Sequence, residues 1–140
     1  KHPLHIGWCV IDPKSVEKVL PSLNEMGVEK ITFIYCKRSQ KSFTLELEKI
    51  KRELLQYSGA MIIGGDFNNW STKRVKVLNA FQQDLSLQKA DIDDYHHIKH
   101  IFSKPLDHVF YRGVTLLKAE AIDTKNISEH NPIYATFTIG

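Results

Sequence analysis

The stretch that decides the fold is "GAMIIGGDFNNW", residues 59–70, where an uninterrupted apolar run ends in an acid, an aromatic residue and amides. A short continuous apolar run is typical of a strand that is covered on both faces. We therefore predict a strand that ends at Asp66, at the edge where open α/β sheets usually bind ligands. In the alternative interpretation, Asp66 caps the following helix and Asn69 belongs to a turn.

Strand and helix patterns alternate on both sides of this stretch. Apolar runs predict strands, and apolar residues at helical spacing predict helices. The predicted strands are residues 4–11, 30–36 and 60–66; the predicted helices follow Pro13 up to Gly27, cover residues 44–56, and begin near Ser71 or Thr72. This repetition implies parallel strands joined by right-handed crossovers.

The pattern changes after residue 85, where strands follow one another without helices. Residues 106–111 and 115–122 predict two strands joined as a hairpin across Arg112-Gly113, and residues 133–139 alternate cleanly. Residues 91–105, with His96, His97 and His100, predict a loop or a short strand. The predicted fold class is α/β, with one mixed sheet of five to seven strands. Its parallel βαβαβ part is N-terminal, its C-terminal strands are antiparallel, and the helices pack on the sheet.

The composition indicates a single domain over residues 1–140, with 42% hydrophobic residues, 25% charged residues and a net charge of +3. No apolar run approaches the roughly 18 residues of a membrane span, so we expect no membrane partner. Cys9 and Cys36 lie apart without a CxxC pattern, which favours reduced thiols and a cytoplasmic location. Three small basic clusters favour an anionic ligand: Lys37-Arg38-Lys41, Lys49-Lys51-Arg52 and Lys73-Arg74-Lys76.

Three short motifs place acids, amides and histidines beside predicted strands. They are "GGDFNNW" at residues 64–70, "PLDHVF" at residues 105–110 and "SEHNP" at residues 128–132. Together they resemble the C-terminal half of the endonuclease/exonuclease/phosphatase superfamily, over residues 42–140. The resemblance implies a metal-dependent phosphoesterase. Each motif alone also has a structural interpretation, as a strand end, a half-buried histidine or a turn.

The resemblance implies a role for each matching residue. Asp66 would position or deprotonate the attacking water and lie at the metal, and Asn68 would bind a phosphate oxygen or assist at the metal. Asp107 would orient His130, whose charged imidazole would stabilise the developing negative charge. Glu129 would bind Mg²⁺, although this position is usually an aspartate, and the longer side chain disturbs the octahedral geometry that Mg²⁺ demands.

The first forty residues resemble a different family. The segment "LNEMGVEKITFIYCKRSQ", residues 23–40, is similar to the opening of the bacterial ribosomal-RNA uridine methyltransferases of the knotted fold. The Gly-rich loop and knotted segment of that family have no counterpart, so we expect no S-adenosylmethionine site. We interpret the chain as a chimera of a methyltransferase-like βαβ fragment, residues 1–41, and the phosphoesterase-like half, residues 42–140.

Three functions remain open on this interpretation. The first is a recombined domain that carries half of a phosphoesterase site and has little or no activity alone. The second is an active Mg²⁺-dependent phosphodiesterase or nuclease acting on a phosphate ester or nucleic acid. The third is an RNA-contacting module derived from the methyltransferase part. Because one sheet of the phosphoesterase fold is missing, the uncovered face predicts either a homodimer or a three-layer monomer with helices on both faces.

Overall fold

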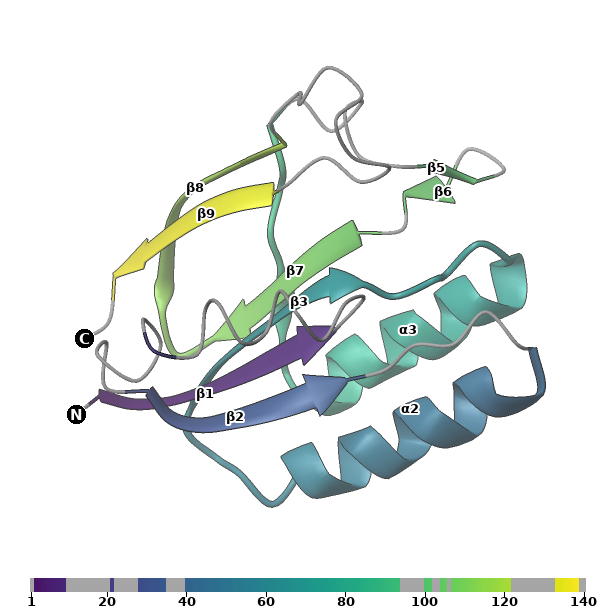
Figure 1. Ribbon diagram of the computed structural model, residues 1–140, viewed down its shortest axis with the longest axis horizontal. Helices are drawn as coiled ribbons and strands as arrows, with labels where there is room; N and C mark the ends of the chain where they lie inside the picture. The colour runs from purple at the N-terminus through teal and green to yellow at the C-terminus, as the bar shows by residue number, and fades with distance from the viewer. Residues whose placement is uncertain are drawn as a thin grey trace.

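The computed structural model describes residues 2–9, 21, 28–34, 40–93, 100–101, 104–105, 107–121 and 133–138 (Figure 1). Its elements, in chain order, are β1 (His2–Cys9), β2 (Val28–Ile34), α2 (Gln40–Leu54), β3 (Ala60–Asp66), α3 (Thr72–Asp84), β4 (Gln88–Lys89), β5 (His100–Ile101), β6 (Lys104–Pro105), β7 (Asp107–Arg112), β8 (Thr115–Ala121) and β9 (Ile133–Thr138). The predicted helix between Pro13 and Gly27 lies outside the described residues, apart from the helical Pro21. His96 and His97 lie outside them as well.

The central sheet has five strands in the order β2-β1-β3-β7-β4. Strand β1 is parallel to both β2 and β3, whereas β7 is antiparallel to both β3 and β4. Helices α2 and α3 lie side by side against this sheet (Figure 1). The structure thus confirms an α/β fold with a mixed sheet whose first strands are parallel and whose last are antiparallel.

The predicted hairpin across Arg112-Gly113 is wrong. Strand β7 pairs with β3 and β4, while β8 pairs with β9 in a separate two-stranded sheet, so the chain changes sheets at this turn. Gly113 has a φ of +70°, and a Cβ atom there would lie 2.9 Å from the Cα of Ala60. The turn therefore needs glycine both for its backbone conformation and for its close approach to β3.

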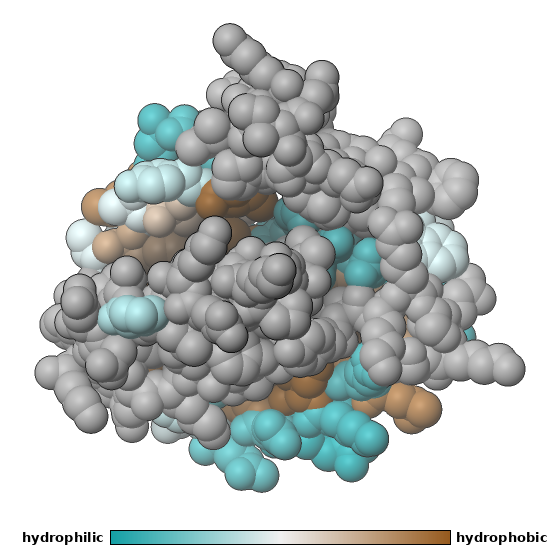
Figure 2. Space-filling model, in the orientation of Figure 1, coloured by the Kyte–Doolittle hydropathy of each residue, from teal (hydrophilic) through white to brown (hydrophobic). Residues whose placement is uncertain are grey.

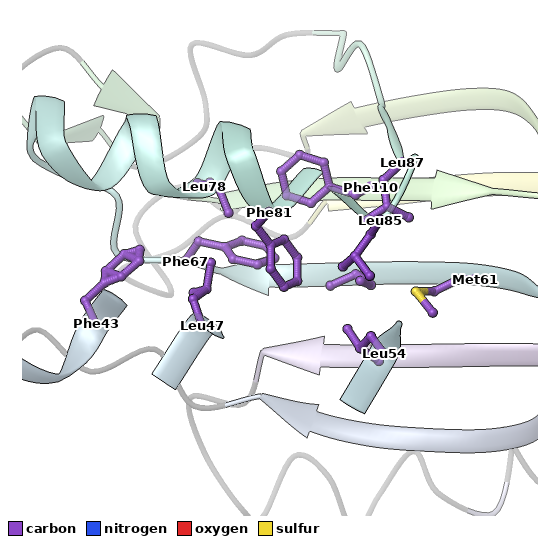
Figure 3. Packing of buried hydrophobic residues seen from close by; sticks show 11 residues of the cluster. Phe43, Leu47, Leu54, Met61, Phe67, Leu78, Phe81, Leu85, Leu87 and Phe110 are labelled. Atoms are coloured by element: carbon purple, nitrogen blue, oxygen red, sulfur yellow. The ribbon is translucent and has the colours of Figure 1, made fainter. Parts of the chain in front are cut away.

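The main core lies between the two helices and the central sheet. Figure 3 shows Phe67 and Phe110, from the sheet side, packed against side chains of α2 and α3. The rings of Phe67 and Phe110 meet edge to face, with centroids 5.3 Å apart. The buried members of this cluster are Phe43, Leu47, Leu54, Met61, Ile63, Phe67, Leu78, Phe81, Leu85, Leu87 and Phe110.

A second apolar cluster joins the central sheet to the β8–β9 pair. Ala119 of β8 is buried with Val109 of β7, and the rings of Tyr111 and Phe137 meet edge to face with centroids 5.4 Å apart. Strand β9 alternates between half-buried and exposed residues, as its sequence predicts. We expected one face of the sheet to stay uncovered, because the second sheet of the phosphoesterase fold is missing. The β8–β9 pair instead covers part of the sheet. The homodimer stays a prediction.

Arg112 bonds to the segment after α2 and to the C-cap of α3. Its guanidinium group donates from Nε to the carbonyl oxygen of Gly59, at 3.1 Å, and from Nη1 to that of Leu85, at 2.6 Å. Its Nη2 donates to the carbonyl oxygen of Tyr57. Gly59 and Tyr57 follow the C-terminus of α2, and Leu85 caps the C-terminus of α3. One planar cation at the end of β7 thus satisfies the carbonyl group at the C-cap of α3 and two carbonyl groups of the segment that joins α2 to β3.

No helix among the described parts of the chain combines the length and the apolar character needed to cross a membrane.

We predict that Gly113→Ala destabilises the protein by about 1–2 kcal/mol, because an L-residue is strained at positive φ and its Cβ meets the backbone of β3. Gly64→Ala is the matched control, since a Cβ there meets Val109 at an ordinary contact distance of 3.7 Å. Urea denaturation measures both variants. Equal unfolding free energies for the two variants would contradict the assigned role of Gly113.

We also predict that Arg112→Lys lowers the unfolding free energy by about 2 kcal/mol, because one ammonium group cannot replace three directed N–H bonds to separate carbonyl groups. Lys118→Met is the control. Lys118 is exposed and lies 3.6 Å from Glu120, so its loss should cost less than about 0.5 kcal/mol. A loss below that level for Arg112→Lys would show that the segment after α2 and the C-cap of α3 do not depend on the guanidinium group.

Candidate functional site

The candidate site lies where β3 and β7 end side by side. Asp66, the last residue of β3, is the register partner of Asp107, the first residue of β7. Residues directly opposite one another in an antiparallel pair project from the same face of the sheet. Both side chains are buried, with exposed fractions of 9% and 6%. The structure thus brings together two acids that lie 41 positions apart in the sequence.

The loop after β3 is shaped by Asp66 and Asn68. The carboxylate of Asp66 accepts a hydrogen bond from the backbone N–H of Asn68, at 2.8 Å. Asn68 has a φ of +50°, a left-handed conformation that asparagine tolerates better than most residues. The residue that caps α3 is Ser71, whose hydroxyl accepts from the N–H of Arg74. The alternative in which Asp66 caps this helix is therefore wrong.

The structural role of Arg74 was not predicted from the sequence. We counted it in a basic cluster that favours an anionic ligand, but its side chain is only 3% exposed. Its Nη1 donates to the carbonyl oxygen of Asn68, at 3.0 Å. Its guanidinium carbon lies 4.5 Å from the ring centre of Phe43 and 4.8 Å from that of Trp70. Arg74 therefore packs in the interior. Its cation–π contacts join α3 to Phe43 of α2 and to Trp70 of the loop after β3.

Asn69 and His108 form a second internal link that the sequence analysis did not identify. The Oδ1 atom of Asn69 lies 3.1 Å from Nε2 of His108, and both side chains are buried. The ring of His108 stacks beside that of Phe110, two residues along β7, with centroids 5.8 Å apart. The bond ties the loop after β3 to the neighbouring strand. The adjacency of "DFNN" and "LDH" in paired strands was the signal that could have predicted it.

Two predicted site residues cannot be placed. Glu129 and His130 lie outside the described residues, so their proposed contacts with Asp66 and Asp107 remain untested predictions. Within the part of the chain that the structure describes, no group of three or more His, Cys, Asp or Glu side chains could hold a metal ion. Of the predicted set, the structure brings together Asp66, Asn68 and Asp107.

Comparison with known families gives a match to a model described as an RNA methyltransferase domain, over residues 1–58. A UPF0294 protein of Vibrio parahaemolyticus is 34% identical over 118 residues, which is 84% of this chain and 41% of that protein. A UPF0294 protein of Yersinia enterocolitica is 39% identical over 95 residues, 68% of this chain and 36% of that protein. The chain thus spans well under half the length of these relatives.

Among solved structures, the fold is similar to that of a functionally unknown conserved protein from Enterococcus faecalis V583. The TM-score is 0.50 at 16% sequence identity, and the match covers 76% of this chain and 48% of that one. At this identity the likeness concerns the fold alone.

These findings correct our assignment to the endonuclease/exonuclease/phosphatase superfamily. The family model describes an RNA methyltransferase domain, and the relatives carry the name UPF0294. The Vibrio match also covers 118 of 140 residues, so it must cross the junction that we placed near residue 41. One relative that runs through the junction argues against a chimera. The phosphoesterase function, its hydrolase character and its magnesium requirement are therefore wrong as predicted.

The structure gives a physical reason for this error. "GGDFNNW" and "PLDHVF" are short motifs, and several of their polar residues form hydrogen bonds that stabilise the fold. Asp66 and Asn68 shape a turn, and Asn69 and His108 bond to each other. Such roles favour the same residue types as a catalytic motif does, because acids and amides at strand ends satisfy backbone groups.

We predict that Arg74→Lys destabilises the protein by about 1–3 kcal/mol, because an ammonium group cannot stack between two rings while donating to Asn68. Tryptophan fluorescence should also change, since Trp70 loses its partner. Lys73→Gln, an exposed neighbour on the same helix turn, is the control and should change stability by less than about 0.5 kcal/mol. Similar stabilities of the two variants would remove the assigned role of Arg74.

Proposed function

We propose that this domain binds single-stranded RNA through the outer face of helices α2 and α3. The observation that carries the proposal is the match of residues 1–58, which include β1, β2 and α2, to an RNA methyltransferase domain model. The proposal assigns RNA contact, and not methyl transfer, to this chain. The Gly-rich loop and knotted segment that bind S-adenosylmethionine in the knotted methyltransferases have no counterpart in the sequence.

The exposed cations of the two helices support this surface. Lys49 and Arg52 of α2 and Lys73 and Lys76 of α3 are all exposed. The two helices lie side by side, and hydrophilic side chains gather along the lower edge of Figure 2, where Figure 1 draws α2. We call these four residues the basic face. Cations on neighbouring helices can follow the phosphates of one strand, which supply most of the sequence-independent affinity.

Lys51 does not belong to the basic face, because it has acidic partners. Its Nζ lies 2.9 Å from a carboxylate oxygen of Asp84 and 3.1 Å from carboxylate oxygens of Glu48. The hydrogen bond to Asp84, and then that to Glu48, raises the pKa of Lys51 above its ordinary value of 10.5. The same bonds tie two of the acids on these helices to a local cation, which weakens their repulsion of an approaching phosphate.

The proposed location is cytoplasmic, supported by the two separated cysteines of the sequence. The homodimer remains a further proposal, with the basic face on each copy.

We predict that the double variant Lys73→Gln/Lys76→Gln weakens RNA binding and makes it less dependent on salt. Each lost phosphate contact lowers the slope of log affinity against log salt by about 0.7 on a single strand, so two contacts lower it by about 1.4. Fluorescence anisotropy with a labelled single-stranded RNA measures the slope.

Lys118→Gln removes one charge from β8, away from the helices, and should leave the slope unchanged. A protein that shows no RNA binding at low salt would overturn the proposed function. A change of slope of about 0.7 in Lys118→Gln, half that of the double variant, would show that net charge, and not the basic face, governs binding. Addition of S-adenosylmethionine should change neither the anisotropy nor the thermal stability.

A further inference from the structure

A small cavity lies beside the Asn69–His108 bond, between α3 and the sheet. Its volume is about 160 Å³, and the described residues that line it are Asn69, Val75, Leu78, Asn79, Lys89, His108 and Phe110. Leu78, His108 and Phe110 are buried and form its inner wall, whereas Asn79 and Lys89 are exposed and form its rim. The cavity lies wholly outside residues 1–58, so the methyltransferase resemblance does not account for it.

The size of the cavity selects the ligand. A protein cavity of about 150 Å³ accommodates one benzene ring, so this one has room for a single six-membered ring, whereas a fused pair would extend out of its mouth. Its walls are apolar at Val75, Leu78 and Phe110, which suits the faces of a planar ring. The side-chain amide of Asn79, and the amide nitrogen that Asn69 does not use in its contact with His108, provide groups that can bond to ring nitrogen and carbonyl atoms.

The positive charge of Lys89 gives a second requirement for the ligand, which is a negatively charged group. Lys89 belongs to the short edge strand β4, is exposed, and is one of the residues that line the cavity. An anionic group attached to the ring, and lying outside the cavity, would meet this cation.

We propose that the cavity binds the base of a pyrimidine nucleotide, with the phosphate group held at Lys89. The choice of a nucleotide among ring-bearing anions rests on the proposed function. The nucleotide is either an unstacked residue of bound RNA or a free mononucleotide, and both present the same base and phosphate.

The experiment is titration of the isotope-labelled protein with cytidine 5′-monophosphate, followed by the amide NMR signals of the cavity residues. Saturable shifts should appear at Leu78, Lys89 and Phe110. Guanosine 5′-monophosphate should bind at least about 10-fold more weakly, an energy difference of about 1.4 kcal/mol. Absence of saturable shifts, or equal binding of the purine nucleotide, would overturn the proposal.

Two pairs of measurements locate the ligand. Asn79→Trp covers the mouth and should abolish the shifts, whereas Ala80→Trp, the next exposed residue on the same helix, should leave them. Lys89→Gln should weaken the binding of cytidine 5′-monophosphate several-fold and leave the binding of uncharged cytidine unchanged. Equal behaviour of the two tryptophan variants, with thermal stability unchanged, would place the nucleotide elsewhere and refute the site.

The source of the nucleotide is decided with RNA. If the cavity binds a nucleotide of bound RNA, Asn79→Trp weakens the binding of oligocytidylate and leaves the binding of oligoadenylate unchanged. If it takes a free mononucleotide, neither oligonucleotide is affected while the monophosphate still loses its site. The two proposals also fail separately, because loss of RNA binding by Lys73→Gln/Lys76→Gln concerns the basic face and leaves the monophosphate titration unchanged.

Discussion

The constraint on which the structure depends is that β3 must be paired on both edges and covered on both faces. Strand β1 joins it in parallel on one edge and β7 joins it antiparallel on the other. Met61 and Ile63 face the main core, while Ile62 faces the cluster shared with the β8–β9 pair. Since successive residues of a strand point to opposite faces, the apolar positions 61–63 of this strand have apolar neighbours on both faces. The polar loop can follow immediately because its strand is fixed so completely.

The sequence predicted much of this architecture because the apolar runs are short and the helical spacing is regular. The strand ending at Asp66 and the helix following Ser71 were predicted close to where they lie. The partners of strands were harder to predict. Nothing in residues 106–122 states that β8 leaves the sheet of β7, since that depends on the close approach of Gly113 to Ala60. Pairing between distant segments is a property of packing, which a local pattern does not record.

In the site, likewise, the positions of residues could be predicted from the sequence, whereas their roles depend on contacts between distant segments. Asp66, Asn68 and Asp107 were predicted to lie together, and their positions at the paired ends of β3 and β7 follow from strand register. Their chemistry was misassigned, because a motif of acids and amides also describes a well-bonded loop. Arg74 was misjudged for a related reason. A basic residue between two lysines looks like surface, and only the positions of Phe43 and Trp70 show that it is buried.

The contacts of Arg112 have a consequence for the order of events during synthesis. This residue lies 55 positions after Tyr57, 53 after Gly59 and 27 after Leu85. Both helices therefore leave the ribosome well before the cation that binds the segment after α2 and the C-cap of α3. Contacts across such sequence separations form late, since a long loop must close first. The nascent N-terminal part should remain loosely closed until β7 is complete, and then tighten in one step.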